Sequence, residues 1–384
     1  MAPEIALAHV AELAPDSVVL DPMSGSGMVL SQASRKGMKP IGFDLDPLAK
    51  LISKVGATNV NPDLIRKRAN ELLHKVENSC ERGESITLDW IDSDPETSKF
   101  IDYWFAEKQR HQLRAFALHL IATPFTTSRT ILDFMKVAVS RLIVTKEPKA
   151  SLARDTAHSR PHRTILQNDF DIVEEFHRSI EQMLSALKPH EILTNAKVYK
   201  GDARQLSRLE AGSVDAIITS PPYLNAIDYM RGHKMSLVWM GYTIRELREI
   251  RATSIGSEKS MHIRDSEEFD ELHDALGLNE LTSRQTQMLF RYYIDLKALT
   301  AESARVLRSG ANACYVIGNS NIKDTHVRNS EFLKSCARSV GLKLVDEQVR
   351  EIPNNRRYMP ISLNKENSLS KRMRTEHIIS FEAQ

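Results

Sequence analysis

Apolar and polar positions follow two different rhythms along the chain. Near its start, apolar runs at 17–22 and 40–47 flank a segment, 29–36, whose apolar residues recur at helical spacing. Short apolar runs bounded by turn residues are typical of buried strands, and a helix between two of them is typical of a parallel sheet. Further runs at 197–204 and 214–218 resume this alternation. The pattern predicts an α/β fold whose strands come from both ends of the chain.

The middle of the chain, residues 51–194, has helical periodicity almost throughout. A connection of this length is far longer than the crossover between two parallel strands requires. We therefore expect a mostly helical domain inserted into the sheet domain, which comprises 1–50 and 195–384. The helices of the insertion are expected at 63–81, 98–123, 129–144 and 170–187.

After the second set of strands, helices and strands alternate again. Residues 245–284 are charged and poor in apolar residues, which favours a mobile segment, and it follows closely on the Thr219–Tyr223 segment described below as a candidate site. A helix at 285–308 precedes Ser309 and Gly310, a pair suited to a helix C-cap. The other expected elements are helices at 2–13, 224–241 and 330–340, and strands at 311–318, 342–350 and 376–381.

Composition indicates an ordinary globular protein in which any affinity for a polyanion must be local. The chain has 384 residues, of which 41% are hydrophobic and 27% charged, and its net charge is only +2. Its cysteines, Cys80, Cys314 and Cys336, form no CxxC pair, which argues against a disulfide framework or a structural zinc site. No stretch has the length of a membrane span or the pattern of a signal peptide. We expect a cytoplasmic protein with no metal and no membrane partner.

The strand at 214–218 leads into Thr219-Ser220-Pro221-Pro222-Tyr223. The two prolines end the strand, because neither donates a backbone hydrogen bond, and they stiffen the turn. The Ser220 hydroxyl and the Pro221 carbonyl are both able to accept from one amino group. The Tyr223 ring is able to stack on the plane that carries that group, as on a base extruded from a helix. The candidate catalytic residues are Ser220, Pro221, Pro222 and Tyr223.

A second candidate site follows the first strand, at Asp21-Pro22-Met23-Ser24-Gly25-Ser26-Gly27. Small residues allow a tight turn and close approach of a ligand, and the helix behind the loop presents free N–H groups. The loop has neither the phosphate-binding GxxxxGK[ST] form nor the GxGxxG form. Asp21 suits an ammonium group, as in an amino-acid-like ligand.

Two further acidic strand ends fit a nucleoside. Asp44 ends the second strand, where an acid typically takes ribose hydroxyls, whereas Asp46 before Pro47 is better suited to a helix N-cap. Asp202 ends the strand at 197–204 and could accept from an adenine amino group. These residues alone leave a dinucleotide and another adenosine cofactor equally open.

Two cationic stretches are candidates for contact with nucleic acid. Residues 145–163 are largely without apolar period and are rich in Lys, Arg, His, Ser and Thr, groups that contact phosphates. A solvated surface loop is the alternative interpretation. Residues 353–360 form a second cationic loop that contains an aromatic residue. The candidate nucleic-acid-binding residues are Lys146, Lys149, Arg154, Arg160, Arg163, Arg356 and Arg357.

Taken together, residues 21–27 and 219–223 resemble the two signature motifs of the amino-group DNA methyltransferases, which methylate N4 of cytosine or N6 of adenine. The resemblance implies an α/β fold with a Rossmann-like seven-stranded methyltransferase sheet and a large mostly helical insertion. It also implies S-adenosyl-L-methionine as the cofactor and 51–194 as the target-recognition domain. Met23 and Met28 depart from the family, which usually has an aromatic residue and Thr there, and the first departure would loosen packing on the cofactor.

The resemblance also implies roles for individual residues. Asp21 and Gly25 would line the methionine end of the cofactor, and the ribose and adenine would meet Asp44 and Asp202. Double-stranded DNA is the implied partner, and a restriction endonuclease is a further one in a restriction–modification system. The cofactor-binding candidates are Asp21, Pro22, Ser24, Gly25, Gly27, Asp44, Asp202 and Ala203.

We expect methyl transfer to the exocyclic amino group of a flipped base. Cytosine N4 is favoured over adenine N6, because the family's cytosine-N4 enzymes mostly begin the motif with Ser or Thr, and a hydroxyl could also donate to a pyrimidine ring acceptor. RNA guanine-N2 methyltransferases, an alternative, usually carry Asp-Pro-Pro-Tyr. A non-catalytic binding subunit would be expected to lose Ser220, Tyr223 or the glycine loop. Cytosine-C5 transfer needs a nucleophilic Cys, typically after Pro, and no Cys here follows Pro.

Overall fold

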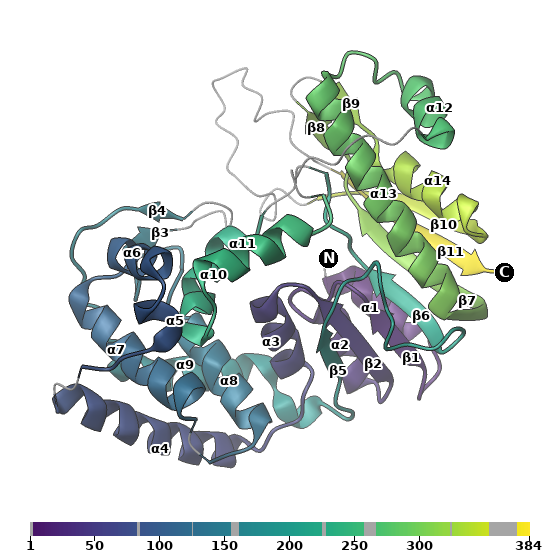
Figure 1. Cartoon of the computed structure of the whole chain (residues 1–384). Coiled ribbons are helices and arrows are strands. Elements are labelled where there is room, and N and C mark those ends of the chain that lie inside the picture. Colours follow the sequence, from purple (N-terminus) through teal and green to yellow (C-terminus); the bar gives the residue numbers. More distant parts are fainter. Residues whose placement is uncertain are drawn as a thin grey trace. The chain divides into compact units, whose positions relative to one another are not determined.

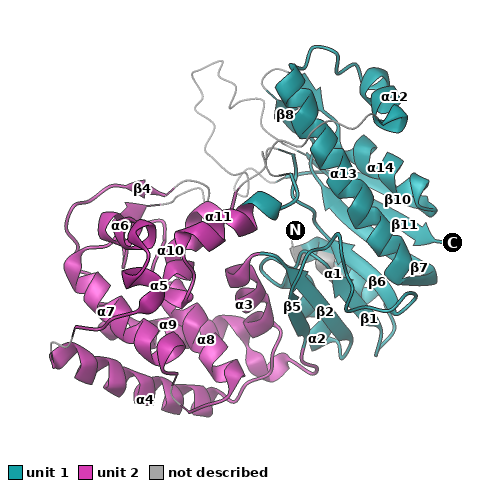
Figure 2. Cartoon of the chain, in the orientation of Figure 1, with its two compact units in different colours: residues 1–45, 196–227, 252–384 teal, residues 46–195, 228–251 magenta. Residues whose placement is uncertain are grey.

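The computed structural model of the chain forms two compact units (Figures 1 and 2). Unit 1 comprises Met1–Leu45, Ala196–Ile227 and Ala252–Gln384, and unit 2 comprises Asp46–Asn195 and Asp228–Arg251. The segment 228–251, which we expected in the sheet domain, is therefore part of unit 2. The structure describes residues 3–82, 85–124, 126–154, 161–224, 228–256, 266–322, 325–352 and 375–384.

Unit 1 is built on a seven-stranded sheet with the order β10-β11-β7-β6-β1-β2-β5. The pairs β6–β7, β6–β1, β1–β2 and β2–β5 are parallel, whereas β11 is antiparallel to both of its neighbours. This mixed sheet confirms the Rossmann-like methyltransferase fold expected from the sequence. Its strands are β1 (Val18–Asp21), β2 (Lys39–Asp44), β5 (Lys197–Lys200), β6 (Val214–Thr219), β7 (Leu307–Ile317), β10 (Leu342–Glu351) and β11 (Thr375–Ala383).

Helices cover the sheet of unit 1 on both faces. Successive strand residues such as Val19 and Leu20 point to opposite faces, and they belong to two different apolar clusters. Val19 packs with Val10 of α1 and Val29 of α2, whereas the cluster of Leu20 includes residues of α13 and α14. The helices of unit 1 are α1 (Pro3–Ala11), α2 (Met28–Arg35), α12 (Glu267–Ala275), α13 (Ser283–Val306) and α14 (Asn329–Ser339), and a small hairpin pairs β8 (Ser320–Ile322) with β9 (Thr325–Val327).

Unit 2 is mostly helical and has a separate apolar core. The aromatic rings of Phe116 and Phe176 pack 5.1 Å apart within it, and Trp239 meets Phe105 edge-on at 5.2 Å. Its helices are α3 (Pro47–Gly56), α4 (Pro62–Glu81), α5 (Asp89–Asp92), α6 (Pro95–Trp104), α7 (Glu107–Ala117), α8 (Arg129–Ser140), α9 (Ile172–Leu187), α10 (Met230–Leu237) and most of α11 (Ile244–Thr253). Short turns at Leu118–Ala122, Pro189–Glu191 and Val238–Met240 and the hairpin of β3 (Ala153–Arg154) with β4 (His162–Arg163) complete its described elements.

Side-chain capping explains where several of these helices begin. Asp46 accepts hydrogen bonds from Leu48 N at 2.8 Å and from Ala49 N at 3.3 Å, which confirms it as the N-cap of α3. Asp171 caps α9 in the same way, through Val173 N and Glu174 N. Among the described residues, no helix is long and apolar enough to cross a membrane, and no cluster of three potential metal ligands occurs.

Three expected elements differ in the structure. Residues 245–284, expected as a mobile segment, contain the helices α11 and α12, and residues 257–265 between them lie outside the described part. The helix expected at 98–123 is divided into α6 and α7 at Phe105, whose backbone is extended. The helix expected to end at Ser309–Gly310 ends instead at Val306 and runs directly into β7.

Candidate active site in unit 1

The predicted site loops lie at one edge of the sheet. β6, β1, β2 and β5 are parallel neighbours, so the residues that follow each strand meet at its carboxyl edge, where ligands bind in open α/β sheets. Residues 22–27 follow β1, Leu45 follows β2 and 220–224 follow β6. The loop after β5 joins them through a hydrogen bond from Gly201 N to Asp44 O, 3.1 Å long.

The glycine loop after β1 is held by backbone hydrogen bonds. Ser24 N donates to Phe43 O at 2.8 Å, and Gly27 N donates to Ser24 O at 2.7 Å. Gly25 and Gly27 have φ values of 49° and 77°, a region that L side chains rarely adopt, so the turn requires glycine there. A Cβ atom on Gly25 would meet only Met23 O, at 3.9 Å, so the space over the loop is open. The loop thus offers an open cradle for a ligand.

The candidate ribose residue Asp44 also supports this loop. Its Oδ2 accepts a hydrogen bond from Gly25 N at 2.8 Å, which ties the end of β2 to the loop after β1. Gly42, two residues before Asp44 in β2, has a role that we did not predict. A Cβ atom there would lie 2.4 Å from Leu30 Cδ1 of α2 and 3.3 Å from Ser24 Cβ of the glycine loop, so a larger residue would force the Leu30 side chain to move and would crowd the loop.

Asp21 is a buried carboxyl at the end of β1. It is 4% exposed, and its Oδ1 accepts from Thr219 Oγ1 at 2.8 Å and from Met23 N at 3.2 Å. Burial raises the pKa of Asp21 to about 6, and the two hydrogen bonds oppose the shift without cancelling it. Thr219 ends β6, so this contact links the glycine loop directly to the turn at 220–224, which contains the candidate catalytic residues.

The Ser220 hydroxyl is oriented by β7. Its Oγ–H donates to Val316 O at 2.9 Å, so the remaining lone pairs of Oγ are available to accept a hydrogen bond. The expectation that this hydroxyl accepts from an amino group is compatible with that geometry. The suggestion that it donates to a pyrimidine ring atom is not, because its single proton is already committed to the Val316 carbonyl.

Two long-range hydrogen bonds fix the rest of the turn. Tyr292 of α13 donates its hydroxyl to Pro222 O at 3.0 Å, and Ser320 of β8 donates to Leu224 O at 2.5 Å. Pro221 is buried, whereas Pro222 is exposed. The turn is therefore held from three elements, β7, β8 and α13, that come after it in the chain.

Tyr223 is fixed through its hydroxyl while its ring is partly exposed. The hydroxyl donates to Glu376 Oε1 of β11 at 3.3 Å, and Glu376 Oε2 accepts from Arg350 Nε of β10 at 3.1 Å. Holding a ring by its rim limits its rotation and leaves its face for stacking.

The loop after β5 contains the last two cofactor candidates. Ala203 is 3% exposed and packs in the apolar core. Asp202 is partly exposed, and its carboxylate is bound on both oxygens by Arg204. The cysteines of β7 and α14, Cys314 and Cys336, do not suit nucleophilic chemistry, because burial raises the pKa of each thiol to about 12 and keeps it protonated.

The cationic candidates of unit 2 fall into two groups. Lys146 and Lys149, together with Arg141 at the end of α8, line a hollow of about 330 Å³, which also receives Ser179 and Gln182 of α9. Lys149 Nζ also lies 6.0 Å from the centre of the Phe170 ring. The other two described candidates do not line this hollow: Arg154 pairs with Glu147 at 3.5 Å, and the Arg163 guanidinium lies 4.9 Å from the centre of the Tyr103 ring. Arg160, Arg356 and Arg357 lie outside the described residues.

Sequence reasoning missed several residues that shape the site. Tyr292 lies in the helix expected at 285–308 and Glu376 begins the strand expected at 376–381, and neither was predicted to reach the site. Arg204 stands two positions after Asp202, so a carboxylate and a guanidinium at that spacing could have been recognised as a pair. Arg141 lies four residues before the polar stretch 145–163.

These features define the class of fold: a Rossmann-like methyltransferase sheet with a glycine loop after its first strand and a Ser-Pro-Pro-Tyr turn after a central one. No family model matches the chain. Over 364 residues it is 19% identical to the type II methyltransferase M.MvaI of Kocuria varians, a match that spans 88% of this chain and 77% of that protein. It is 22% identical over 378 residues to the type II methyltransferase M.AvaI of Nostoc sp., which spans 88% of this chain and 75% of that protein.

Among solved structures, the chain is similar to a SAM-dependent methyltransferase from Methanosarcina mazei. The identity is 9%, the match covers 100% of this chain and 98% of that one, and the TM-score is 0.37. The distant relatives in sequence are thus named type II methyltransferases.

Proposed function

We propose that this protein is a DNA methyltransferase that transfers a methyl group from S-adenosyl-L-methionine to the exocyclic amino group of a flipped base. The observation that carries the proposal is the Ser220 hydroxyl, which donates to Val316 O and keeps its lone pairs for an amino group. It lies one residue from Thr219, whose hydroxyl bonds to the buried Asp21. The type II methyltransferases to which the chain is related support the same function.

The residues of the glycine loop fit the proposed cofactor. Asp21 is an acid whose burial an ammonium group would offset, and the open space over Gly25 admits a ligand. When bound, S-adenosyl-L-methionine supplies an activated methyl group on a sulfonium. We propose that Asp21 and Gly25, with Pro22, Ser24 and Gly27, receive the methionine end, and that Asp44, Asp202 and Ala203 receive the nucleoside.

The catalytic turn acts by orientation. An aromatic amine is a poor nucleophile because its lone pair is delocalised into the ring. Hydrogen bonds from its two N–H groups to Ser220 Oγ and to the Pro221 carbonyl favour a pyramidal nitrogen, while Tyr223 stacks on the ring and Pro222 stiffens the turn. Ser220 is neutral and is no strong base, so the proton leaves late, to solvent.

We propose cytosine N4 as the target, with adenine N6 as the alternative. The choice rests on Ser220 at the first position of the motif, as in the resembled cytosine-N4 enzymes. A second argument for cytosine, that Ser220 donates to a pyrimidine ring atom, is removed by the contact with Val316 O. The acceptors Ser220 Oγ and Pro221 O by themselves would therefore receive the amino group of either base.

DNA contact is proposed for unit 2, as a target-recognition domain. Three cations, Arg141, Lys146 and Lys149, line its hollow, and cations in this arrangement attract phosphates. Arg160, Arg356 and Arg357 remain candidates for the same role, whereas Arg154 and Arg163 would act mainly by fixing the β3–β4 hairpin. In a restriction–modification system, a restriction endonuclease of the same specificity would be the partner in the cell.

Nucleoside mass spectrometry tests the function directly. Purified protein is incubated with S-adenosyl-L-methionine and either plasmid DNA or transfer RNA, and the digested products are compared. N4-methylcytosine in DNA is the expected product, and Ser220→Ala should lower its rate about a hundredfold or more while cofactor binding persists. If the product is N6-methyladenine, the target base is adenine and not cytosine. If the only product is N2-methylguanine in RNA, the substrate is RNA and not DNA. No methylated product with either nucleic acid would indicate a binding subunit.

A further inference from the structure

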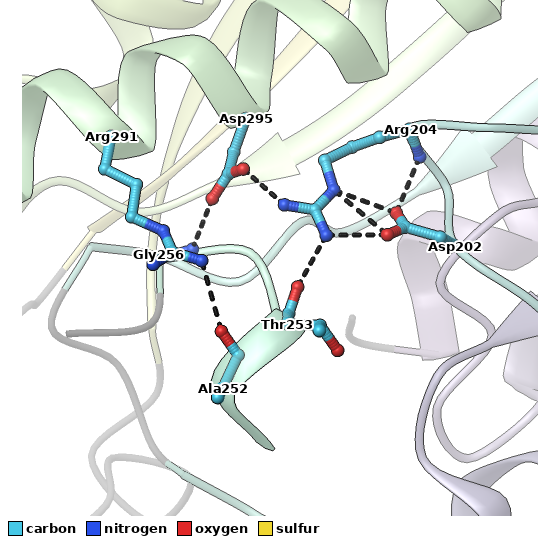
Figure 3. Close-up of polar contacts among 7 residues, drawn as sticks. All are labelled: Asp202, Arg204, Ala252, Thr253, Gly256, Arg291 and Asp295. Carbon is cyan, nitrogen blue, oxygen red and sulfur yellow. Dashed lines mark hydrogen bonds and ion pairs between the residues drawn. The ribbon is translucent and has the colours of Figure 1, made fainter. Parts of the chain in front are cut away.

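Arg204 is the centre of a dense polar network behind the loop after β5 (Figure 3). Its Nε donates to Asp202 Oδ1 at 2.9 Å and its Nη2 donates to Asp202 Oδ2 at 2.6 Å, so guanidinium and carboxylate face each other side by side. The backbone N–H of Arg204 donates to Asp202 Oδ1 as well, at 2.9 Å. This is the bidentate geometry that only an arginine provides.

The far side of the guanidinium is anchored on α13. Its Nη1 forms an ion pair with Asp295 Oδ1, and Asp295 is 5% exposed. Nη2 also donates to Thr253 O at 2.5 Å. The two carboxylates hold the pKa of Arg204 above its usual range, although its partial burial opposes the rise. Arg204 therefore stays charged and is restrained on both sides.

The same helix fixes the segment to which Arg204 donates. Asp295 Oδ2 accepts from Gly256 N at 3.1 Å, and Arg291 Nη2 donates to Ala252 O at 3.1 Å. Figure 3 shows Arg291 and Asp295 reaching from α13 toward residues 252–256, with the Arg204 guanidinium between Asp295, Asp202 and Thr253. Asp202 thus has an indirect but continuous connection to a long, well-packed helix.

This arrangement restricts the direction in which Asp202 is able to accept. A carboxylate has about four lone-pair sites. Arg204 takes two on Oδ1, and it donates to Oδ2 from Nη2 at 2.6 Å and from Nε at 3.2 Å, the longer branch of a bond that Nε shares with Oδ1. Both donors to Oδ2 belong to the guanidinium, so the remaining capacity lies on the side of Oδ2 that faces away from it. A single oriented acceptor discriminates between ligands better than a freely rotating carboxylate. A ligand without a donor at the matching position leaves that acceptor unpaired, which costs binding free energy.

We propose that Arg204 is a positioning residue that orients Asp202 to recognise the 6-amino group of the cofactor's adenine, with Asp295 as its anchor. The inference rests on the proposed use of S-adenosyl-L-methionine. Under the alternative, the network merely ties residues 202–204 and 252–256 to α13, and the loss of Arg204 would lower stability without changing which purine is preferred.

Calorimetry with two ligands separates these roles. The probes are S-adenosylhomocysteine and its analogue whose purine lacks the 6-amino group. The wild-type protein is expected to prefer the first by roughly tenfold to a hundredfold, as charge-assisted hydrogen bonds allow. Arg204→Met and Asp202→Asn should each reduce this preference to a few-fold. Arg204→Lys keeps the charge and loses the bidentate geometry, so it should restore little of the preference.

A matched control is Arg208→Met, because Arg208 lies in the same loop and stacks on Tyr199, 5.1 Å from its ring centre. It should leave the preference unchanged. If the Arg204→Met variant does not fold, the nearly isosteric Asp295→Asn variant is used instead. It should partly reduce the preference for the ligand with the 6-amino group. An undiminished preference in a folded Arg204→Met or Asp295→Asn variant overturns the proposal.

Failure of the inference and failure of the proposed function give different results. A wild-type protein that binds both ligands equally and still methylates DNA would overturn the role of Arg204 alone. A wild-type protein that binds neither ligand would overturn the cofactor assignment and the inference with it.

Discussion

At the scale of single residues, Asp21 combines burial with a titration in an accessible range. Its pKa is raised from an ordinary value of 3.8 to about 6, chiefly by burial. A carboxyl at this pKa is mostly protonated at pH 5 and mostly ionised at pH 7. An ammonium group on a bound ligand pairs with the ionised form only.

Cofactor affinity should therefore rise with pH through about 6 and level off above 7. Between pH 5 and pH 7.5 the expected gain is about tenfold, since about a tenth of Asp21 is ionised at pH 5. Titration calorimetry with S-adenosylhomocysteine measures it, together with proton uptake or release in buffers of different ionisation enthalpy. Asp21→Asn should bind weakly at every pH, and a variant that kept the wild-type pH dependence would show that another group titrates.

The same shift has an opposite consequence for stability. Because the folded protein holds this proton more tightly than the unfolded chain, the contribution of Asp21 to stability falls as pH rises from about 4 to about 6 and is constant above. Between pH 4.5 and pH 7 the wild-type protein without ligand should lose about 2 kcal/mol relative to Asp21→Asn. Urea unfolding at pH 4.5 and 7 would measure the difference.

Candidate residues that stand in short motifs could be proposed from the sequence, whereas residues that contact them from far along the chain could not. Asp21, Gly25 and Ser220 stand in short contiguous motifs whose chemistry is local. Tyr292 and Glu376 contact the catalytic turn across 70 and 153 positions, and no spacing in the sequence encodes such contacts. The close contact of Gly42 could not be predicted either, because it is with Leu30 on the helix that covers it.

At the scale of elements, α13 fastens two parts of the candidate site. Tyr292 and Asp295 are three positions apart and so lie on one face of the helix. The first holds the catalytic turn through Pro222 O, and the second holds the Asp202 loop through Arg204. Tyr292 is fully buried, and burial raises the pKa of its hydroxyl well above the usual value, so it remains a donor.

Tyr292→Phe should therefore slow methyl transfer without weakening cofactor binding. Loss of one hydrogen bond costs about 1 kcal/mol of stability, whereas a turn displaced by a fraction of an ångström should lower kcat about tenfold or more. Single-turnover kinetics and calorimetry separate the two effects. Tyr315→Phe is the matched control, because the buried Tyr315 hydroxyl donates to Ser303 Oγ at 2.6 Å and not to the turn. Equal kcat in both variants would contradict a positioning role for Tyr292.

Two errors in predicted elements have physical reasons. The expected helix 98–123 contains no Gly or Pro that would divide it, and the break at Phe105 follows from burial of that ring against Trp239, which is far away in the sequence. Gly310, taken as part of a helix cap, has a φ of 76° inside β7, where the register with β6 shifts. A glycine signal marks a positive φ and does not distinguish a cap from a bulge.

At the scale of the whole molecule, a net charge of +2 leaves DNA affinity to local groups of cations. Arg141, Lys146 and Lys149 share one hollow of unit 2. Replacing all three by Gln should weaken DNA binding and flatten the slope of log K against log salt by up to about 3, since each phosphate contact contributes roughly 0.9. Fluorescence anisotropy between 50 and 300 mM salt, about the range where such slopes are resolved, measures it.

The control is a triple variant of unit 1 with the same change in charge. It replaces three exposed cations by Gln: Lys36, Arg338 and Lys343. This variant should keep the wild-type slope. If the two triple variants show equal slopes, the hollow is an ordinary solvated surface and the contacts with phosphate lie elsewhere in the chain.

The division of the chain between the two units has a consequence during synthesis. The chain passes from one unit to the other after residues 45, 195, 227 and 251. Val19 of β1 pairs with Ala216 of β6. At the usual rate of translation, β6 is therefore synthesised roughly 10 to 40 s after β1. The core of unit 2 is also incomplete until then, because Trp239 belongs to it and is synthesised only after β6. The two units must therefore mature together, and fragments cut at residue 195 would each expose apolar surface that the intact chain buries.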